Sequence, residues 1–173
     1  LDVADRRKPQ SGSFQIEIGG HKIDFRVKTA GSTRGEQLGL EKIEDTELLP
    51  IDEVGFLPDQ LQAMETLIRE PGPGIVLICG KPQSGVTTTL YSLIRKHDAF
   101  TQNIYALEID PQMDLDNITQ HKVERGAAPE QCARQLQTVL RTDPDIVLVG
   151  FCNGADMAKI GTKAAREGKR LYF

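Results

Sequence analysis

The stretch with the clearest chemical potential runs from Gly80 to Thr87 and reads GKPQSGVT. An apolar run directly before it predicts a buried strand, and the TTLY that follows predicts the start of a helix. A strand, a glycine-bounded loop and a helix N-terminus together turn backbone N–H groups toward a phosphate. The stretch matches the phosphate-loop pattern G-x-x-x-x-G-K-[ST] at every fixed position except one, where Val86 replaces the lysine.

Backbone N–H groups and hydroxyls of this loop define a candidate nucleotide-binding site. The residues that we assign to it are Gly80, Lys81, Ser84, Gly85, Val86, Thr87 and Thr88. The Thr87 hydroxyl is the candidate metal ligand, because the last position of the pattern contacts the metal ion that accompanies a nucleotide.

The composition is that of a globular chain without a strong electrostatic field. The sequence has 173 residues, 39% of them hydrophobic, and a formal net charge of −4. We therefore expect no nucleic-acid partner. No apolar run reaches the ~18 residues of a membrane span, so we expect a cytoplasmic protein without direct membrane insertion. The chain begins without Met or a signal-peptide core and stops inside a strand, so we expect a piece of a longer protein.

Cysteines and histidines show no metal-ligand spacing. These residues are Cys79, Cys132, Cys152, His21, His97 and His121. We expect the cysteines to be reduced and buried, because two of them flank apolar runs. We expect each histidine to be an isolated surface or turn residue.

The elements that must position the loop fall into two parts. Residues 14–30 alternate apolar and polar side chains around a Gly-Gly pair, which predicts a β-hairpin, and Leu38 and Leu40 predict a third strand. An acidic connector follows, and apolar residues at helical spacing predict a helix over 58–70. We assign 1–57 to a partial β-rich domain with its connector and 58–173 to a second domain.

The second part alternates apolar strands with helices. We expect strands at 75–79, 103–108, 145–149 and 170–173, and helices at 86–97, 129–142 and 154–167. Continuous apolar strands separated by helices predict an α/β fold with a mostly parallel sheet covered by helices on both faces.

Several motifs in this order resemble those of the hexameric ATPases of type II secretion and type IV pilus assembly, a bacterial family. The matching stretches are Leu1–Gly12, Arg26–Thr29, Gly35-Glu36, Gly55-Phe56, Gly80–Tyr91 and Arg141–Gly150. The resemblance implies the RecA-like fold of phosphate-loop NTPases, ATP and Mg²⁺ as cofactors, and a hexameric homo-oligomer. It also implies partners among secretion or pilus assembly proteins, and a place at the inner face of the membrane through those partners.

The chain departs from this family at most of the charged positions that the activity uses. The phosphate-loop lysine is Val86, and the glutamate that ends the Walker B motif is Phe151. In the aspartate box Glu108 is kept, but the next acid is Ile109 and Asp110 comes one residue later.

Three further positions bear on the resemblance. The middle glycine of the loop is Gln83, which costs about 1 kcal/mol if the backbone there needs a positive φ. Arg26 matches one of two arginines that contact nucleotide phosphates across subunits, and the second falls at Glu41. The histidine box of the family would lie beyond Phe173.

These departures favour a degenerate (pseudo-)ATPase with weak or no hydrolysis and a structural or regulatory role, assembling with an active ATPase paralogue or with secretion proteins. One alternative is an active motor that uses Lys81, Glu108 or Asp110 in changed roles. For Lys81, the model is the deviant phosphate loop of partition-type ATPases, which resembles this loop in carrying a lysine at the same position. A third is a nucleotide or anion sensor that binds through the loop without turnover.

Overall fold

The computed structural model describes residues 8–33, 35–43, 49–70 and 72–173, and the chain forms two compact units. The described residues up to Ile43 lie in the first unit and those from Leu49 onward in the second. The first seven residues of the matching stretch Leu1–Gly12 and the first part of the connector lie outside the described residues.

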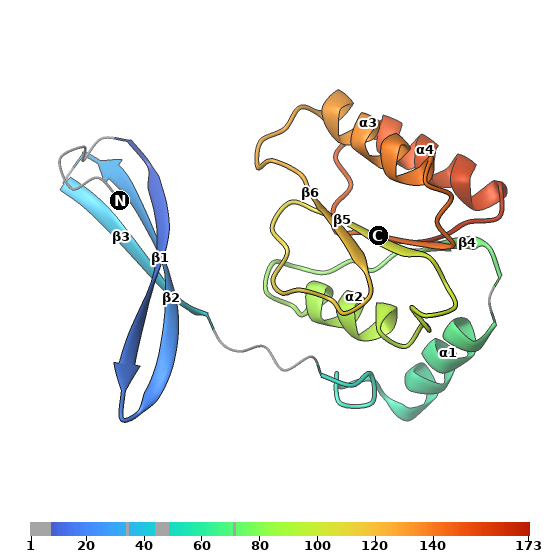
Figure 1. Cartoon of the computed structure of the whole chain (residues 1–173), viewed down its shortest axis with the longest axis horizontal. Coiled ribbons are helices and arrows are strands. Elements are labelled where there is room, and N and C mark those ends of the chain that lie inside the picture. The colour runs from blue at the N-terminus through green and yellow to red at the C-terminus, as the bar shows by residue number, and fades with distance from the viewer. Residues whose placement is uncertain (1–7, 34, 44–48, 71) are drawn as a thin grey trace. The chain divides into compact units, whose positions relative to one another are not determined.

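The first unit is a three-stranded antiparallel sheet in the order β1-β2-β3 (Figure 1). Its strands are β1 (Gln10–Ile18), β2 (His21–Ser32) and β3 (Gly35–Ile43). Gly19 and Gly20 both have positive φ, as a two-residue hairpin turn requires, so the predicted hairpin and third strand are confirmed. Residues that pair directly across strands share a face of the sheet, which places Phe14 with its partner Phe25 on one apolar side.

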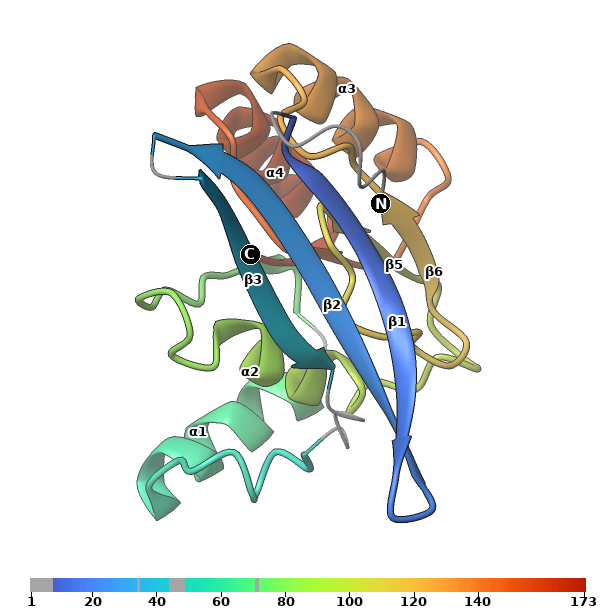
Figure 2. The same ribbon diagram turned by 90° about the vertical axis from the view of Figure 1, so that its left-hand side faces the viewer.

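The second unit is a five-stranded sheet in the order β4-β8-β7-β5-β6, with every neighbouring pair parallel. Its elements are α1 (Pro58–Arg69), β4 (Gly74–Val76), α2 (Val86–Ile94), β5 (Ile104–Glu108), β6 (Thr119–Lys122), α3 (Pro129–Leu140), β7 (Ile146–Val149), α4 (Ala155–Arg166) and β8 (Arg170–Tyr172). Helices α3 and α4 cover one face, and α1 and α2 lie on the other (Figures 1 and 2). The predicted parallel sheet with two covered faces is therefore confirmed.

The alternation of side chains along β7 divides the core of this unit into two layers. Val147 and Val149 face α3 and α4, whereas Ile146 and Leu148 face α2. All four are buried, as expected for a strand covered on both sides. Strand β7 is therefore the central strand of the sheet, and the loop that follows it lies at the carboxyl end of the sheet.

The first strand of the second unit differs from its prediction. Strand β4 ends at Val76 rather than at residue 79, and the side chains of Ile75 and Leu77 are 41% and 68% exposed. The reason is that β4 pairs only with β8 among the described residues, so it forms an edge of the sheet. The opposite edge strand, β6, escaped prediction because its sequence, TQHK, has no apolar residue.

Residues 49–57 pack with the second unit. Ile51 is fully buried, and the Ser92 hydroxyl of α2 donates to the Leu49 carbonyl at 2.6 Å. Phe56 packs against the α2 layer of the core. The division of the chain into domains at residue 57 stays a prediction.

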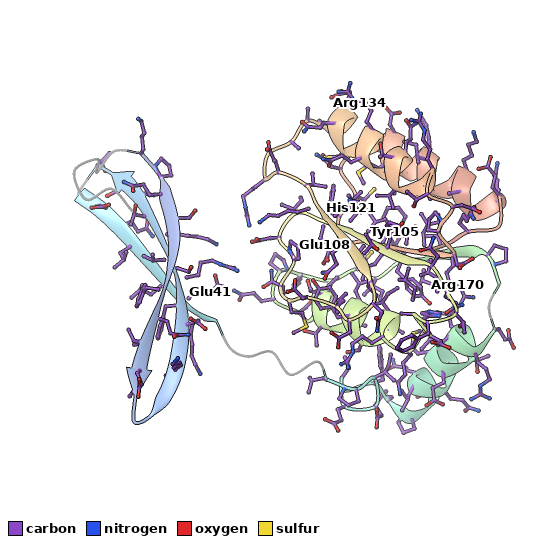
Figure 3. All side chains as sticks on the ribbon, in the orientation of Figure 1. Glu41, Tyr105, Glu108, His121, Arg134 and Arg170 are labelled. Atoms are coloured by element: carbon purple, nitrogen blue, oxygen red, sulfur yellow. The ribbon has the colours of Figure 1, made fainter. Side chains whose placement is uncertain are left out.

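The cysteine and histidine expectations need correction. Cys132 is buried, but Cys79 and Cys152 are exposed, because both stand in loops after the strands rather than in them. His97 is buried, and its Nε2 lies 2.7 Å from the Tyr172 hydroxyl. His121 is exposed on β6 as expected, with its ring stacked on Tyr105 (Figure 3). The side chain of His21 is outside what the structure describes.

Candidate functional site

The phosphate loop keeps the backbone turn of its pattern. Gly85 precedes α2 with φ +89°, and its carbonyl accepts the first helical hydrogen bond from Thr89 N–H at 2.9 Å. Gln83 has φ +65°, the left-handed conformation that favours glycine, and Ser84 N–H donates to the Lys81 carbonyl at 3.1 Å. The expected strain at Gln83 is therefore present in the structure.

The inner surface of the loop is lined by Val86. A methyl group added at Gly80 would lie 2.7 Å from Val86 Cγ2 and would clash with the Ser84 hydroxyl, so these two side chains stand directly over the Gly80 backbone. Thr87 is exposed and Thr88 half-buried at the first turn of α2, where helix geometry leaves N–H groups without intrahelical acceptors. The loop thus offers backbone donors to an anion, but an apolar side chain at the lysine position.

Glu108, which we expected to be the kept acid of the aspartate box, is only 5% exposed at the end of β5. Its two oxygens accept hydrogen bonds from the Tyr91 hydroxyl at 2.7 Å and from Gln120 Nε2 at 3.3 Å. Burial, and next the hydrogen bond to Glu108, raise the pKa of Tyr91 well above its usual value. We call these three residues the Glu108 network, and it ties α2, β5 and β6 together.

Three residues of the loop between β5 and β6 complete this network. Gln120 also accepts from Leu115 N–H at 2.8 Å and donates to the Met113 carbonyl at 3.1 Å. The Tyr91 hydroxyl accepts from Gln112 N–H at 3.2 Å. The Glu108 carboxylate is therefore engaged on both oxygens, with donors that are themselves fixed by the loop between β5 and β6.

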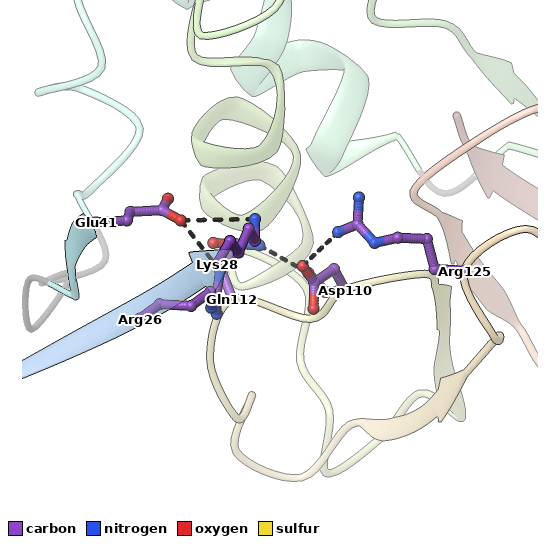
Figure 4. A network of polar contacts seen from close by, with 6 residues as sticks. All are labelled: Arg26, Lys28, Glu41, Asp110, Gln112 and Arg125. Atoms are coloured by element: carbon purple, nitrogen blue, oxygen red, sulfur yellow. Dashed lines mark hydrogen bonds and ion pairs between the residues drawn. The ribbon is translucent and has the colours of Figure 1, made fainter. Parts of the chain in front are cut away.

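Asp110, the other candidate acid, forms an ion pair with Arg125 (Figure 4). The distance from Arg125 Nη2 to Asp110 Oδ2 is 2.8 Å, and the Gln112 amide donates to the Asp110 carbonyl at 2.7 Å. Ile109 points to the other side and packs against the α3 layer of the core. The structure therefore places Asp110 with a basic partner of its own, which sequence spacing gave no means to foresee.

The segment after β7 packs toward α3 and α4. Phe151, which we expected at the position of the Walker B glutamate, contacts the apolar core beneath these helices. Asn153 Nδ2 donates to the Ala127 carbonyl at 3.4 Å, and its N–H lies 3.4 Å from Met157 Sδ. Gly150 comes close to Glu108, because a methyl group added there would lie 3.2 Å from Glu108 Cγ.

In the first unit, Arg26 and Glu41 are direct partners across β2 and β3. Glu41 Oε2 lies 3.6 Å from Arg26 Nη1 and 3.9 Å from Lys28 Nζ (Figure 4). Arg26, which we expected to match a nucleotide-contacting arginine of the family, therefore forms an ion pair with Glu41.

In the part of the chain that the structure describes, no three His, Cys, Asp or Glu side chains form a group that could hold a metal. The backbone N–H groups at the start of α2 fit a phosphate. No helix among the described residues is long and apolar enough to cross a membrane.

Comparison with known proteins places the chain among secretion proteins. The family of type II/IV secretion system proteins matches residues 1–171. The chain is 35% identical to the type II secretion system protein HxcR of Pseudomonas aeruginosa and 36% identical to the type II secretion system protein E of Klebsiella pneumoniae, in each case over 97% of its length. It covers 36% and 34% of these proteins, so it spans about a third of their length.

Among solved structures, the Legionella pneumophila ATPase DotB superposes with a TM-score of 0.74. The match covers 95% of this chain and 47% of DotB at 22% identity, which supports the fold. The family match over nearly the whole sequence, with a parallel sheet and a phosphate loop in the expected order, shows that this chain belongs to the type II/IV secretion system protein family.

Proposed function

We propose that the chain is a degenerate (pseudo-)ATPase of this family, with weak or no hydrolysis and a structural or regulatory role. The observation that carries the proposal is the Glu108 network. The only acid kept from the aspartate box is buried and engaged on both oxygens by Tyr91 and Gln120. A buried carboxylate that accepts from two protein donors has fewer acceptor sites left for a water molecule, which favours a structural role for Glu108.

The residues at positions 86 and 151 also favour weak or no hydrolysis. A lysine at Val86 would add a charge-assisted contact worth about 1.5–3 kcal/mol in binding. An acid at Phe151 would supply a water-orienting group of the kind that often contributes about 10²–10⁴-fold in rate. Phosphoryl transfer depends mainly on such positioned charge, so the combined losses are large.

A nucleotide or anion sensor is the second candidate. It is favoured by the backbone of the loop, where Gly85 still begins α2 and the first-turn N–H groups still have the geometry to hold a phosphate. In this function the loop, with Lys81 exposed at its start, would bind ATP or another polyphosphate without turnover. The active-motor alternative requires new roles for Lys81, Glu108 or Asp110.

Activity and partners of the whole protein belong to the same proposal. By likeness to its family, we propose a cytoplasmic protein that meets secretion or pilus assembly proteins at the inner face of the membrane. An active ATPase paralogue or further copies of the chain, in a hexamer, are the oligomeric partners that fit this role.

Two measurements with Mg²⁺ and ATP test the proposal. We expect phosphate release at the level of a Thr87→Ala control, because neither the lysine nor the water-orienting acid is present. Thermal unfolding with increasing ATP separates the two main candidates, since a ligand that binds only the folded state raises its stability. A shift in melting temperature without release would select the sensor, and no shift would leave the structural role.

Phosphate release well above that of the Thr87→Ala control would overturn the proposal. It would assign the activity to the motor alternative, whose three residues could then be replaced one at a time.

A further inference from the structure

The amino end of the parallel sheet contains a polar cavity that the functions proposed above do not use. Its volume is about 230 Å³, and its walls come from the turn after α2, the segment before β4 and the starts of β7 and β8. The polar side chains of this wall include His97, Gln102, Asp145 and Arg170. The cavity lies at the end of the sheet away from Glu108 and the phosphate loop, so it is a separate site (Figure 3).

Arg170 is the buried charge in the wall of this cavity. Its guanidinium donates to the carbonyls of Leu67, Glu70 and Gly72. It also bonds to the Tyr172 hydroxyl. All of these partner groups are uncharged, and none of the carboxylates that the structure describes forms an ion pair with Arg170. A buried arginine is normally paired with an acid, because an unpaired ion loses its hydration without compensation.

The groups around Arg170 supply only part of the missing negative charge. The last carbonyls of α1 carry about half of an elementary charge, which is less than the full charge of the guanidinium. Burial raises the pKa of Tyr172, and burial and next the charge of Arg170 lower the pKa of His97 to about 4. Both of these side chains are therefore neutral at neutral pH. An anion in the cavity would balance the charge that remains on Arg170.

Asp145 restricts the kind of anion that fits the cavity. One of its carboxylate oxygens accepts from Asn103 N–H at 2.7 Å, and the residue is exposed. Asp145 and Arg170 are neighbours across β7 and β8, since Arg170 N–H donates to the Asp145 carbonyl at 3.1 Å. A phosphate or a dicarboxylate would bring a second negative charge toward this acid, which would repel it. A ligand with one carboxylate and one ammonium group would instead meet an opposite charge at each end.

We propose that this cavity binds a small zwitterion of the α-amino acid class, with its carboxylate toward Arg170 and its ammonium group toward Asp145. The Gln102 amide in the same wall offers a further donor and a further acceptor. Cavities of about 150 Å³ take up benzene, so the volume of this one suffices for an amino acid. Binding here requires no nucleotide, so its test is separate from that of the phosphate-release proposal.

Ligand-observed NMR with the common amino acids, each added singly to the full chain, tests the proposal. We expect at least one of them to bind with a Kd of about 1 mM or below. Its two analogues that lack the ammonium group or the carboxylate should each bind about tenfold more weakly or less. ATP should not displace it. The proposal is overturned if no common amino acid binds in this range, if either analogue binds equally well, or if ATP competes.

A pair of matched variants tests the role of Asp145. Asp145→Asn removes the charge but keeps an oxygen for Asn103 N–H, so the fold should persist. We expect the amino acid to bind about tenfold more weakly, and the analogue without the ammonium group to bind more tightly, because the repulsion of its carboxylate is lost. Asp143→Asn removes the same charge at a side chain outside the cavity and should change neither affinity. Equal effects of the two variants, or effects of one sign on both ligands, would contradict the proposal.

The NMR signals of the protein locate the bound amino acid in the unmodified chain. The signals of the Gln102 side-chain amide and of the Asp145 and Gly168 backbone amides should shift on titration, because these residues line the cavity. The backbone amides of the phosphate loop, at the other end of the sheet, should stay unchanged. Shifts confined to the phosphate loop or to the three-stranded sheet would place the ligand elsewhere and overturn the proposal.

Discussion

The two ends of the parallel sheet both carry buried polar residues, but with different surroundings. At the carboxyl end, Glu108 is engaged by Tyr91 and Gln120. At the amino end, the buried guanidinium of Arg170 donates to the carbonyls of Leu67, Glu70 and Gly72 at 2.7, 2.5 and 2.9 Å. Figure 3 shows Glu108 and Arg170 at opposite ends of the sheet.

Arg170 and Glu108 are both buried charged residues, and such residues can be structural or catalytic. Arg170 fastens the C-terminus of α1 to β8, where helix carbonyls favour a cation, and this role is structural. Glu108 resembles it in burial and in having side-chain contacts on each of its charged oxygens, although the resemblance to the family predicts an acid of the aspartate box at this position. If Glu108 is structural as well, its replacement should change stability and leave turnover unaffected.

The largest expected effect is at the amino end. Arg170→Met should lower the free energy of unfolding by about 3 kcal/mol or more, because three hydrogen bonds from a buried charged group are lost. Urea unfolding measures the change. Arg166→Met, an exposed change on α4, should stay within about 0.5 kcal/mol, and equal effects of the two would remove the structural role of Arg170.

A fall in pH should lower the free energy of unfolding through His97, which lies at the same end of the sheet. Burial, and next the nearby Arg170, lower the pKa of His97 to about 4. Its unfolded pKa is about 6.5, so the unfolded state binds more protons below that value and stability falls between pH 6.5 and 4. The loss should reach about 2–3 kcal/mol at the lower limit. Unfolding across this range in His97→Gln should have a shallower pH dependence, and an identical profile would contradict the assignment.

At the carboxyl end, Tyr91→Phe should lower the free energy of unfolding by about 1–2 kcal/mol, because the buried Glu108 carboxylate loses a donor. Tyr105→Phe is the matched control, since its hydroxyl lies outside the Glu108 network and its ring stacks on His121. A smaller effect for Tyr91 than for Tyr105 would show that the network contributes little.

The smallest effect concerns the phosphate loop itself. Gln83→Gly removes the strain of a side chain in the left-handed conformation, but it also gives the unfolded chain more conformational entropy. We therefore expect the free energy of unfolding to rise by about 0.5 kcal/mol or less. Thermal unfolding checks the sign. A clear loss of stability would mean that the Gln83 side chain has contacts that outweigh its backbone strain.

Sequence reasoning succeeded where patterns are periodic or fixed in spacing. The alternation around Gly19-Gly20 predicted the hairpin, and the apolar run at 146–149 predicted the central strand. It failed for the partners of the polar groups. Gln120 lies on a strand without apolar residues, and Arg125 lies 15 residues from Asp110, so no local signal pointed to either contact.

The burial of His97 and Arg170 was equally hidden, because each depends on residues far away in the sequence. Arg170 bonds to carbonyls about a hundred residues earlier, and His97 meets Tyr172 from the last strand. Contacts of this kind follow from the topology of the sheet, which brings β8 between β4 and β7. They can be found only once that topology is known.

Hydrolysis of γ-labelled ATP by the wild-type chain and by Glu108→Gln, with Mg²⁺ and under identical conditions, tests the central claim most directly. The account predicts the same background rate for both proteins, together with a lower free energy of unfolding for Glu108→Gln. A wild-type rate well above that of Glu108→Gln would show that Glu108 takes part in turnover, and would contradict the account.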